Sequence, residues 1–204
     1  NTKLMTKNEQ LLAFFYSIIT ESKREKFDQI ASERTRYLTV VIENVYQEQN
    51  ASAIVRSCDC FGIHDIHAIE KENSFSVNRE IAMGAGKWVN IQHHQDPKYP
   101  TTSALKKLKE KGYRIVATSP HEDDTTIDEL DLNQPTALLF GTEKMGLSEA
   151  AMTHADAFVK IPMYGFSESF NVSVSAALCL HTLRQKLEQM PPEIWKMSPA
   201  EQVE

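Results

Sequence analysis

Long hydrophobic runs are missing from this 204-residue sequence, because no apolar stretch reaches the ~18 residues that a transmembrane helix needs. We therefore expect no association with a membrane. Cysteine is also scarce, and the three cysteines form no Cys-x-x-Cys pair, which excludes a disulfide scaffold and favours reduced thiols in a cytoplasmic protein. Only seven glycines are present, too few for a collagen-like chain. The remaining class is a soluble globular domain, long enough to bury a sizeable core.

Common nucleotide-binding and metal-binding signatures are missing too. Residues 43–49, which follow the first predicted strand, contain no glycine, so the Gly-x-Gly-x-x-Gly turn of a dinucleotide-dependent oxidoreductase is absent. The sequence also lacks a Walker A motif and a Gly-x-Ser-x-Gly nucleophile elbow. His64 and His67 are three residues apart, and on a strand such residues point to opposite faces. Because no cysteine or carboxylate cluster completes a ligand set, we expect no metal.

The net charge of −6 argues against binding nucleic acid over the whole surface, because phosphate contacts require lysine and arginine. Residues 1–36 are the exception, with seven basic and five acidic side chains. If the protein binds RNA, this segment supplies the better candidates. The basic residues that we single out are Lys23, Arg24, Lys26, Arg34 and Arg36. A second lysine-rich run, within residues 106–111, is interpreted as a solvated helix face.

The N-terminal segment has the pattern of an amphipathic helix. Its apolar residues Leu11, Phe14, Phe15 and Ile18 follow the spacing i, i+3, i+4, i+7. The polar residues 20–26 come next, without the small-residue cleavage site of a secretory signal. We therefore predict a packed helix here.

Short apolar runs then alternate with helical patterns along the chain. This alternation predicts an α/β fold with a largely parallel sheet flanked by helices. A long final helix with an apolar face ends at the two prolines 191–192, and we expect the polar tail after it to be loosely ordered. The predicted strands are 38–42, 66–69, 88–91, 113–117, 136–140 and 157–161, and the predicted helices are 50–61, 103–111 and 172–187.

Three polar segments adjoin these buried strands. In the first, Asn50 is predicted to cap a helix that carries Arg56 six residues later. The second, residues 138–148, bends at two glycines around a charged turn, whose backbone amides suit an adenosine or carboxylate group. In the third, residues 161–176, serines and an asparagine crowd the start of the final helix. Each segment alone is explained by capping or by a tight turn.

In this order, the three segments resemble the motifs of the SpoU/TrmH family of SPOUT-class RNA ribose 2′-O-methyltransferases. The resemblance covers about residues 37 to 187. Residues 38–45 and the helical extensions are most similar to the branch that methylates a D-loop guanosine of tRNA. Two positions depart from the family pattern, because Phe170 replaces the usual leucine and Glu168 replaces a common glutamine. Glu168 adds a negative charge near the substrate.

The resemblance implies a deep C-terminal trefoil knot that binds S-adenosylmethionine mainly through backbone groups. The knotted methyltransferase domain would span residues 37–190, between an N-terminal helical extension of residues 1–36 and a C-terminal tail of residues 191–204. Members act as homodimers whose active site draws on both subunits, so the final helix would present an apolar surface to its partner. The matching positions for the methyl donor are Thr118, Gly141, Met145, Gly146, Ile161 and Phe170.

The implied reaction moves a methyl group from a sulfonium to a ribose 2′-hydroxyl, with Arg56 as the central catalytic residue. Two roles stay open: Arg56 accepts the proton with help from a docked RNA phosphate, or it only orients the hydroxyl while the proton leaves to water. Asn50 would hold Arg56 or the ribose, and Glu143, Ser169 and Asn171 would shape the site. The alternatives to a tRNA enzyme are an rRNA ribose 2′-O-methyltransferase and a catalytically inactive RNA-binding protein.

Overall fold

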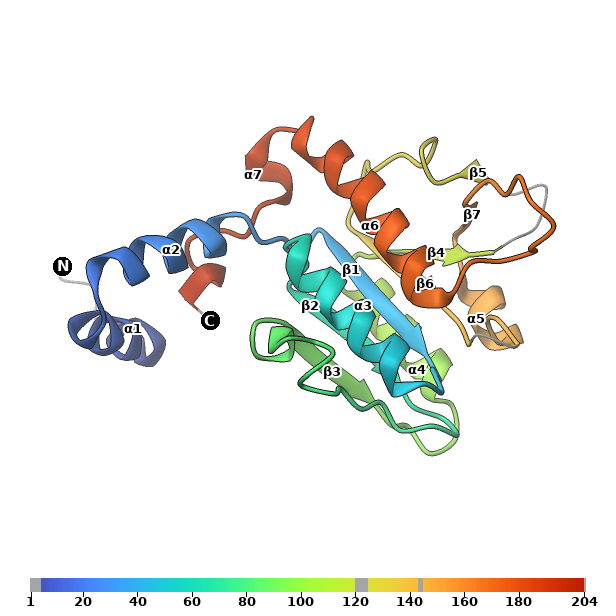
Figure 1. The fold of residues 1–204 in the computed structure, drawn as a ribbon, viewed down its shortest axis with the longest axis horizontal. Helices are drawn as coiled ribbons and strands as arrows, with labels where there is room; N and C mark the ends of the chain where they lie inside the picture. Colours follow the sequence, from blue (N-terminus) through green and yellow to red (C-terminus); the bar gives the residue numbers. More distant parts are fainter. Residues whose placement is uncertain (1–4, 120–124, 143–144, 204) are drawn as a thin grey trace.

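The computed structural model describes residues 5–119, 125–142 and 145–203. Its centre is a seven-stranded sheet in the order β3-β2-β1-β6-β4-β7-β5, and every pairing between these described strands is parallel (Figure 1). The prediction of a largely parallel α/β sheet is confirmed. The strands are β1 (Leu38–Glu43), β2 (Asp65–Ile69), β3 (Asn90–His94), β4 (Arg114–Thr118), β5 (Thr125–Thr126), β6 (Thr136–Phe140) and β7 (Ala157–Lys160).

The middle of the sheet is covered on both faces. All residues of β1 and β6 are buried, as expected for apolar, β-branched runs at the centre of a parallel sheet. Successive side chains alternate between the faces, so Val40 joins one core cluster and Val41 the other. The edge strand β3 is only partly buried.

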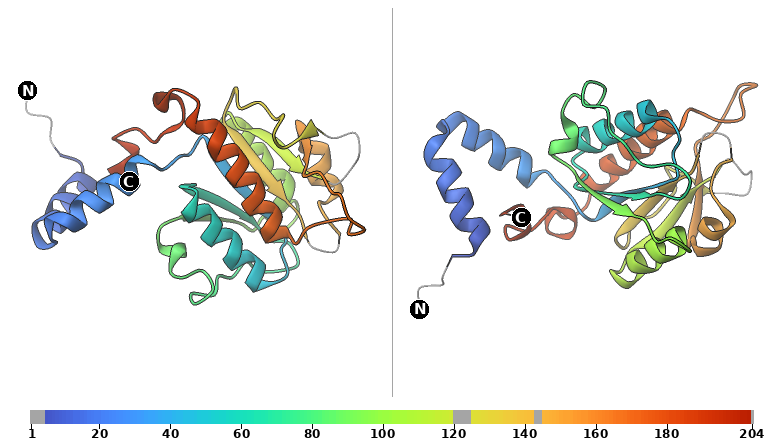
Figure 2. Two further views of the ribbon diagram at one scale, coloured as in Figure 1. Left: turned by 45° about the horizontal axis from the view of Figure 1, so that its top comes forward. Right: turned by 90° about the horizontal axis from the view of Figure 1, so that it is seen from below.

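Two pairs of helices form the outer layers. Helices α3 (Glu48–Cys60) and α6 (Val172–Glu188) lie side by side on one face, and α4 (Pro100–Glu110) and α5 (Glu149–His154) lie on the other (Figure 2). Ile54 and Leu180 are fully buried in the first layer, and Leu105 is fully buried in the second. Within the described ranges, no helix has the length and apolar character required to cross a bilayer.

The N-terminal extension consists of two helices, α1 (Lys7–Ile18) and α2 (Glu21–Ser32), which project away from the sheet (Figure 1). A capping box between Thr6 and Glu9 explains where α1 begins. The predicted helix is therefore present, but the prediction that it is packed is wrong within this chain. Neither helix, all of whose residues are described, contains a buried side chain. In α1, the residues Leu11, Phe14, Phe15 and Ile18 are exposed to between 45 and 63%.

The C-terminal segment was predicted to be loosely ordered, and this prediction is wrong. It forms α7 (Pro192–Trp195) and the short 3₁₀ helix η2 (Glu201–Val203). Trp195 is buried, and the cations of Arg184 and Lys196 lie 4.4 and 5.3 Å from its ring centroid. Its carbonyl accepts a 2.5 Å hydrogen bond from the Thr35 hydroxyl. A single large aromatic side chain therefore anchors a segment whose average polarity suggested disorder.

Two boundaries also differ from the sequence interpretation. Asn50 does not cap α3, because Gln47 occupies the N-cap position and Asn50 lies in the first helical turn. Trp88 does not belong to β3 but follows the 3₁₀ helix η1 (Ala85–Lys87). Both errors are shifts of two or three residues at element ends, where local patterns are least informative.

Candidate functional site

The carboxyl ends of β1, β6, β4 and β7 meet at one edge of the sheet, the usual place for a ligand site in a parallel α/β fold. A cavity of about 510 Å³ lies at this edge. Its walls include Thr118 at the end of β4, Gly141 directly after β6, Ile161 directly after β7, and Cys179 from α6. This volume is in the range that accommodates small ligands and cofactors.

One wall is the turn that follows β6. A Cβ atom on Gly141 would lie 2.2 Å from the carbonyl carbon of Gly146 and 2.5 Å from the backbone nitrogen of Leu147, so no side chain fits there. Thr142 and Gly146 exchange two backbone hydrogen bonds of 2.9 and 3.0 Å, and Gly146 has a φ of +65°, which favours glycine. The turn therefore closes tightly on itself and leaves glycine backbone along the cavity.

A buried carboxylate fixes the far end of this turn. Glu43, the last residue of β1, accepts hydrogen bonds from the backbone nitrogen of Ser148 at 2.9 Å, from the Ser148 hydroxyl at 2.6 Å and from the Thr101 hydroxyl at 2.5 Å. The Ser148 hydroxyl in turn caps α5. Sequence reasoning missed Glu43, although a carboxylate that ends a wholly apolar strand was a usable signal.

The opposite side of the site joins the first and third motifs. The Asn171 side-chain oxygen caps α6 by accepting from the backbone nitrogen and the hydroxyl of Ser173, at 2.9 and 2.6 Å. Its amide nitrogen donates to the side-chain oxygen of Asn50 at 3.0 Å. Asn50 therefore ties the start of α3 to the start of α6, which is a structural task in addition to the predicted one.

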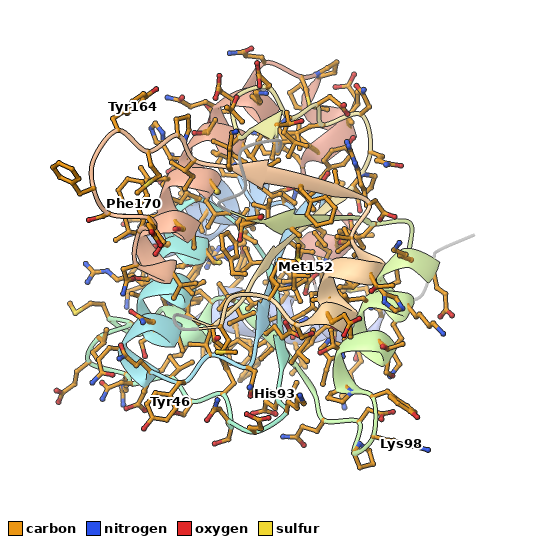
Figure 3. All side chains as sticks on the ribbon, turned by 90° about the vertical axis from the view of Figure 1, so that its right-hand side faces the viewer. Tyr46, His93, Lys98, Met152, Tyr164 and Phe170 are labelled. Atoms are coloured by element: carbon orange, nitrogen blue, oxygen red, sulfur yellow. The ribbon has the colours of Figure 1, made fainter. Side chains whose placement is uncertain are left out.

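The loop between β7 and α6 borders the cavity mouth. Glu168, Ser169 and Phe170 line the cavity, whereas Tyr164, on the same loop, is 96% exposed. Figure 3 shows Tyr164 and Phe170 on this loop, ahead of α6. Met145, at the tip of the facing turn, is also largely exposed. Apolar side chains thus surround an open mouth, as at surfaces that receive a partner.

The predicted site residues fall into three groups. All six predicted donor-binding residues, and Ser169 with them, line the cavity. Asn50 and Asn171 contact each other. Arg56 stands apart: it is exposed on α3 and does not line the cavity, and within the described part of the chain it makes no hydrogen bond or ion pair. Glu143 lies outside the described residues.

Sequence reasoning missed several residues in the cavity wall, including Ser119, Met163 and Cys179. Ser119 directly follows a strand that ends at the cavity, so its position was an available signal. Burial raises the pKa of the Cys179 thiol to about 12, so the thiol is neutral at physiological pH and is no nucleophile.

The five basic residues proposed to contact RNA have different surroundings. Arg34 is buried and forms an ion pair with Asp59, and Arg36 pairs with Asp65 at 3.2 Å. Arg24 is partly buried on α2. Lys23 and Lys26 are exposed on the same helix. Only these two lysines combine full exposure with freedom from ion pairs among the described residues.

Comparison with known proteins decides the family to which the chain belongs. The model of the SpoU rRNA Methylase family matches residues 37–181. The chain belongs to the SpoU family. The match spans the whole sheet and most of α6, and therefore includes all three motifs, of which the second and third line the cavity.

Relatives of this SpoU-family chain have named activities. It is 39% identical over 171 residues to a tRNA (guanosine(18)-2′-O)-methyltransferase of Borreliella burgdorferi, covering 84% of this chain and 77% of the relative. A Thermus thermophilus protein of the same name is 38% identical over 185 residues, covering 87% and 93% of the two chains.

Solved structures agree on the fold. The A. aeolicus TrmH/SpoU tRNA modifying enzyme superimposes with a TM-score of 0.79 at 30% identity, covering 89% of this chain and 91% of the other. The SpoU methyltransferase AviRb from Streptomyces viridochromogenes, in complex with the cofactor AdoMet, gives a TM-score of 0.66 at 25% identity, with 80% and 65% of the two chains covered.

Proposed function

We propose that this SpoU-family chain is an S-adenosylmethionine-dependent methyltransferase that methylates the ribose 2′-hydroxyl of a D-loop guanosine in tRNA. The observation that carries the proposal is the cavity itself, because the second and third motifs line it and the Asn50–Asn171 hydrogen bond joins the first motif to its rim. The choice of tRNA as the substrate rests on relatives named as tRNA (guanosine(18)-2′-O)-methyltransferases, at 38 and 39% identity.

The cavity fits the methyl donor in size and chemistry. Gly141 and Gly146 bring the backbone of the turn to the cavity wall without a side chain. Thr118, Met145, Ile161 and Phe170 would hold the donor from the other sides. When bound, S-adenosylmethionine supplies an electrophilic methyl group on a sulfonium. We further propose that the segments after β6 and β7, whose described residues 141–142, 145–147 and 168–170 line the cavity, belong to the trefoil knot of the family.

Arg56 requires a second subunit in this proposal. Within one chain it does not line the cavity. The outer face of α3 around Arg56 carries the small residues Ala53 and Ser57, and the adjacent α6 leaves Val174 and Leu178 about 40% exposed. A homodimer that covers this face would bring Arg56 of one subunit to the cavity of the other.

We assign Arg56 the orienting role. A guanidinium stays protonated in proteins, so it is a poor acceptor for the 2′-hydroxyl proton. As a fork of donors, it can hold the hydroxyl oxygen and a neighbouring phosphate in line with the methyl group. The proton then leaves to water. Ser169, at the cavity wall, is placed to hold the substrate or the donor by a hydrogen bond.

Of the five candidate residues, Lys23 and Lys26 on α2 are the exposed cations that can bind tRNA phosphates, and the cytoplasm is the compartment that supplies such a substrate. The test is incubation of the purified protein with labelled S-adenosylmethionine and unmodified tRNA and rRNA transcripts, followed by mapping of the methylated nucleotide. We expect a 2′-O-methyl group on a D-loop guanosine, lost in Arg56→Ala. Label confined to rRNA would overturn the substrate, and donor binding without methylation of any RNA would overturn the activity.

A further inference from the structure

Helix α1 exposes an apolar face that its own chain does not cover. Leu11, Phe14, Phe15 and Ile18 are 45, 59, 52 and 63% exposed, and they share one side of the helix. An isolated helix of 12 residues is marginal in water and normally depends on packing of its apolar face. We therefore expect this face to pack against a partner.

The same chain carries an apolar groove of about 1060 Å³ between α2, the end of α3 and α6. Phe27 and Trp88 form its centre, with ring centroids 5.9 Å apart, and Ile30 and Phe61 extend the apolar wall. Phe27 and Trp88 are 40 and 52% exposed. None of the four apolar residues of α1 lines this groove in the described chain.

The apolar centre of the groove favours an apolar helix, and the charged residues around it include both paired arginines and two exposed lysines, Lys23 and Lys26. Arg34 is paired with Asp59, and Arg184 is paired with Glu33 at 3.0 Å and with Glu188 at 3.1 Å. These two arginines are neutralised within the chain, whereas Lys23 and Lys26 stand unpaired at the α2 side of the groove among the described residues. The occupant that matches is an apolar surface with few charges, which is what α1 presents.

We propose that α1 of a second copy of this chain lies in this groove, and that the exchange is reciprocal. With ~150–250 Å² for each aromatic side chain, the exposed parts of the four α1 residues amount to roughly 400 Å² per helix. Two exchanged helices and the two groove walls that they cover reach the ~1,200–2,000 Å² of a standard interface. The groove continues from α3 and α6, the helices of the proposed dimer face, so the inference rests on the homodimer of the proposed function and extends it.

The exchange is testable because Cys60 lines the groove and is exposed. Cys58 and Cys179 are buried, and burial raises the pKa of both thiols, so Cys60 is the reactive thiol of the native chain. A cysteine placed on the apolar face of α1, in the variant Leu11→Cys, would then lie near Cys60 of the second copy. The full-length variant is treated with a short bismaleimide and separated by mass under denaturing conditions.

The matched control is Ala13→Cys, because Ala13 is exposed on the same helix about 200° around from Leu11. We expect a covalent dimer from Leu11→Cys in several-fold higher yield than from Ala13→Cys, and its loss when Cys60→Ser is added. Cross-linking within single chains, or equal yields from both variants, would overturn the exchange. In a second measurement, Phe14→Glu is expected to weaken dimerisation without lowering the content of folded monomer.

Native mass and methyl transfer are recorded on the untreated proteins, so that the two proposals fail separately. A dimer that methylates tRNA but gives no Leu11→Cys cross-link refutes the exchanged helix and leaves the proposed function intact. A cross-linked dimer that methylates no RNA refutes the proposed function and leaves the exchanged helix intact. Protection of Cys60 by tRNA in a dimer that does not cross-link would assign the groove to RNA and overturn the proposal.

Discussion

Replacement of Gly141 by alanine is the sharpest test of how the cavity is built. Gly141 is not among the glycines with positive φ, so alanine is compatible with its backbone conformation. The whole effect is steric, since the added Cβ would lie 2.2 Å from the carbonyl carbon and 2.3 Å from the carbonyl oxygen of Gly146. Both contacts are with backbone atoms, so no side chain can rotate away.

The turn must therefore open by about an ångström. Opening it breaks the two backbone hydrogen bonds between Thr142 and Gly146. Overpacking of this kind costs about 1–3 kcal/mol, and each lost hydrogen bond adds about 1 kcal/mol. If about 2–4 kcal/mol of this falls on the donor site, the affinity for S-adenosylmethionine drops roughly 30- to 1,000-fold. Isothermal titration calorimetry measures the affinity, and urea unfolding measures the part that falls on stability.

Gly165→Ala is the matched control. Gly165 lies on the loop across the cavity mouth, has no positive φ, and a Cβ built on it meets nothing within 4 Å. We expect donor affinity and stability close to those of the wild type. A Gly141→Ala protein that binds the donor as tightly as the control, with unchanged stability, would show that the tight turn does not form the cavity wall.

Three further outcomes are expected. Arg56→Ala should lower turnover at least about 100-fold while leaving donor affinity unchanged, and mixed dimers with Gly141→Ala should recover activity, because each subunit then supplies what the other lacks. Burial, and then the neighbouring His94, lower the pKa of His67 from 6.5 to about 4. As the pH falls, His67 is therefore protonated in the unfolded chain before it is protonated in the folded one. The stability present above pH 6.5 is lost as the pH falls toward 4, by about 2 kcal/mol at about pH 5. Urea unfolding of the wild type and of His67→Gln across this pH range measures the loss. Replacing both Lys23 and Lys26 by glutamine should reduce the salt dependence of tRNA binding by a slope of about 1–2; an unchanged slope would place the phosphate contacts elsewhere.

The sheet was predictable because its strands carry strong, redundant signals. The central run of β1 is wholly apolar and β-branched, and β6 was predicted with its observed bounds at Thr136 and Phe140. Burial on both faces forces such composition, whatever the neighbours are. The cavity residues, in contrast, followed from the resemblance to the family motifs, and Gly141 shows why such a motif is specific, because its position after a strand tolerates no side chain.

Contacts between distant segments were not predictable. Nothing in the local sequence indicates that His67 meets His94, with 3.0 Å between their ring nitrogens, because the register of β2 against β3 decides it. The order of the C-terminal segment was not predictable for the same reason, since Trp195 packs against Arg184, a residue of α6. The average composition of a segment does not show that one of its side chains is buried against a distant part of the chain.

The basic N-terminal segment illustrates the difference between charge in a sequence and charge on a surface. A count of basic residues in the sequence treats Arg34 and Arg36 as equal to the lysines of α2 as candidates for RNA binding. In the structure, both arginines pair with carboxylates that lie more than twenty residues away in sequence. Arg34, with its carboxylate partner Asp59, is part of the groove wall below α2 rather than of an RNA-binding face. Two of the five candidate RNA-binding cations therefore attach the extension to the domain instead. The exposed cations in the described part of this extension are Lys7 on α1 and Lys23 and Lys26 on α2, and the last two line the groove where we place the helix of a second subunit.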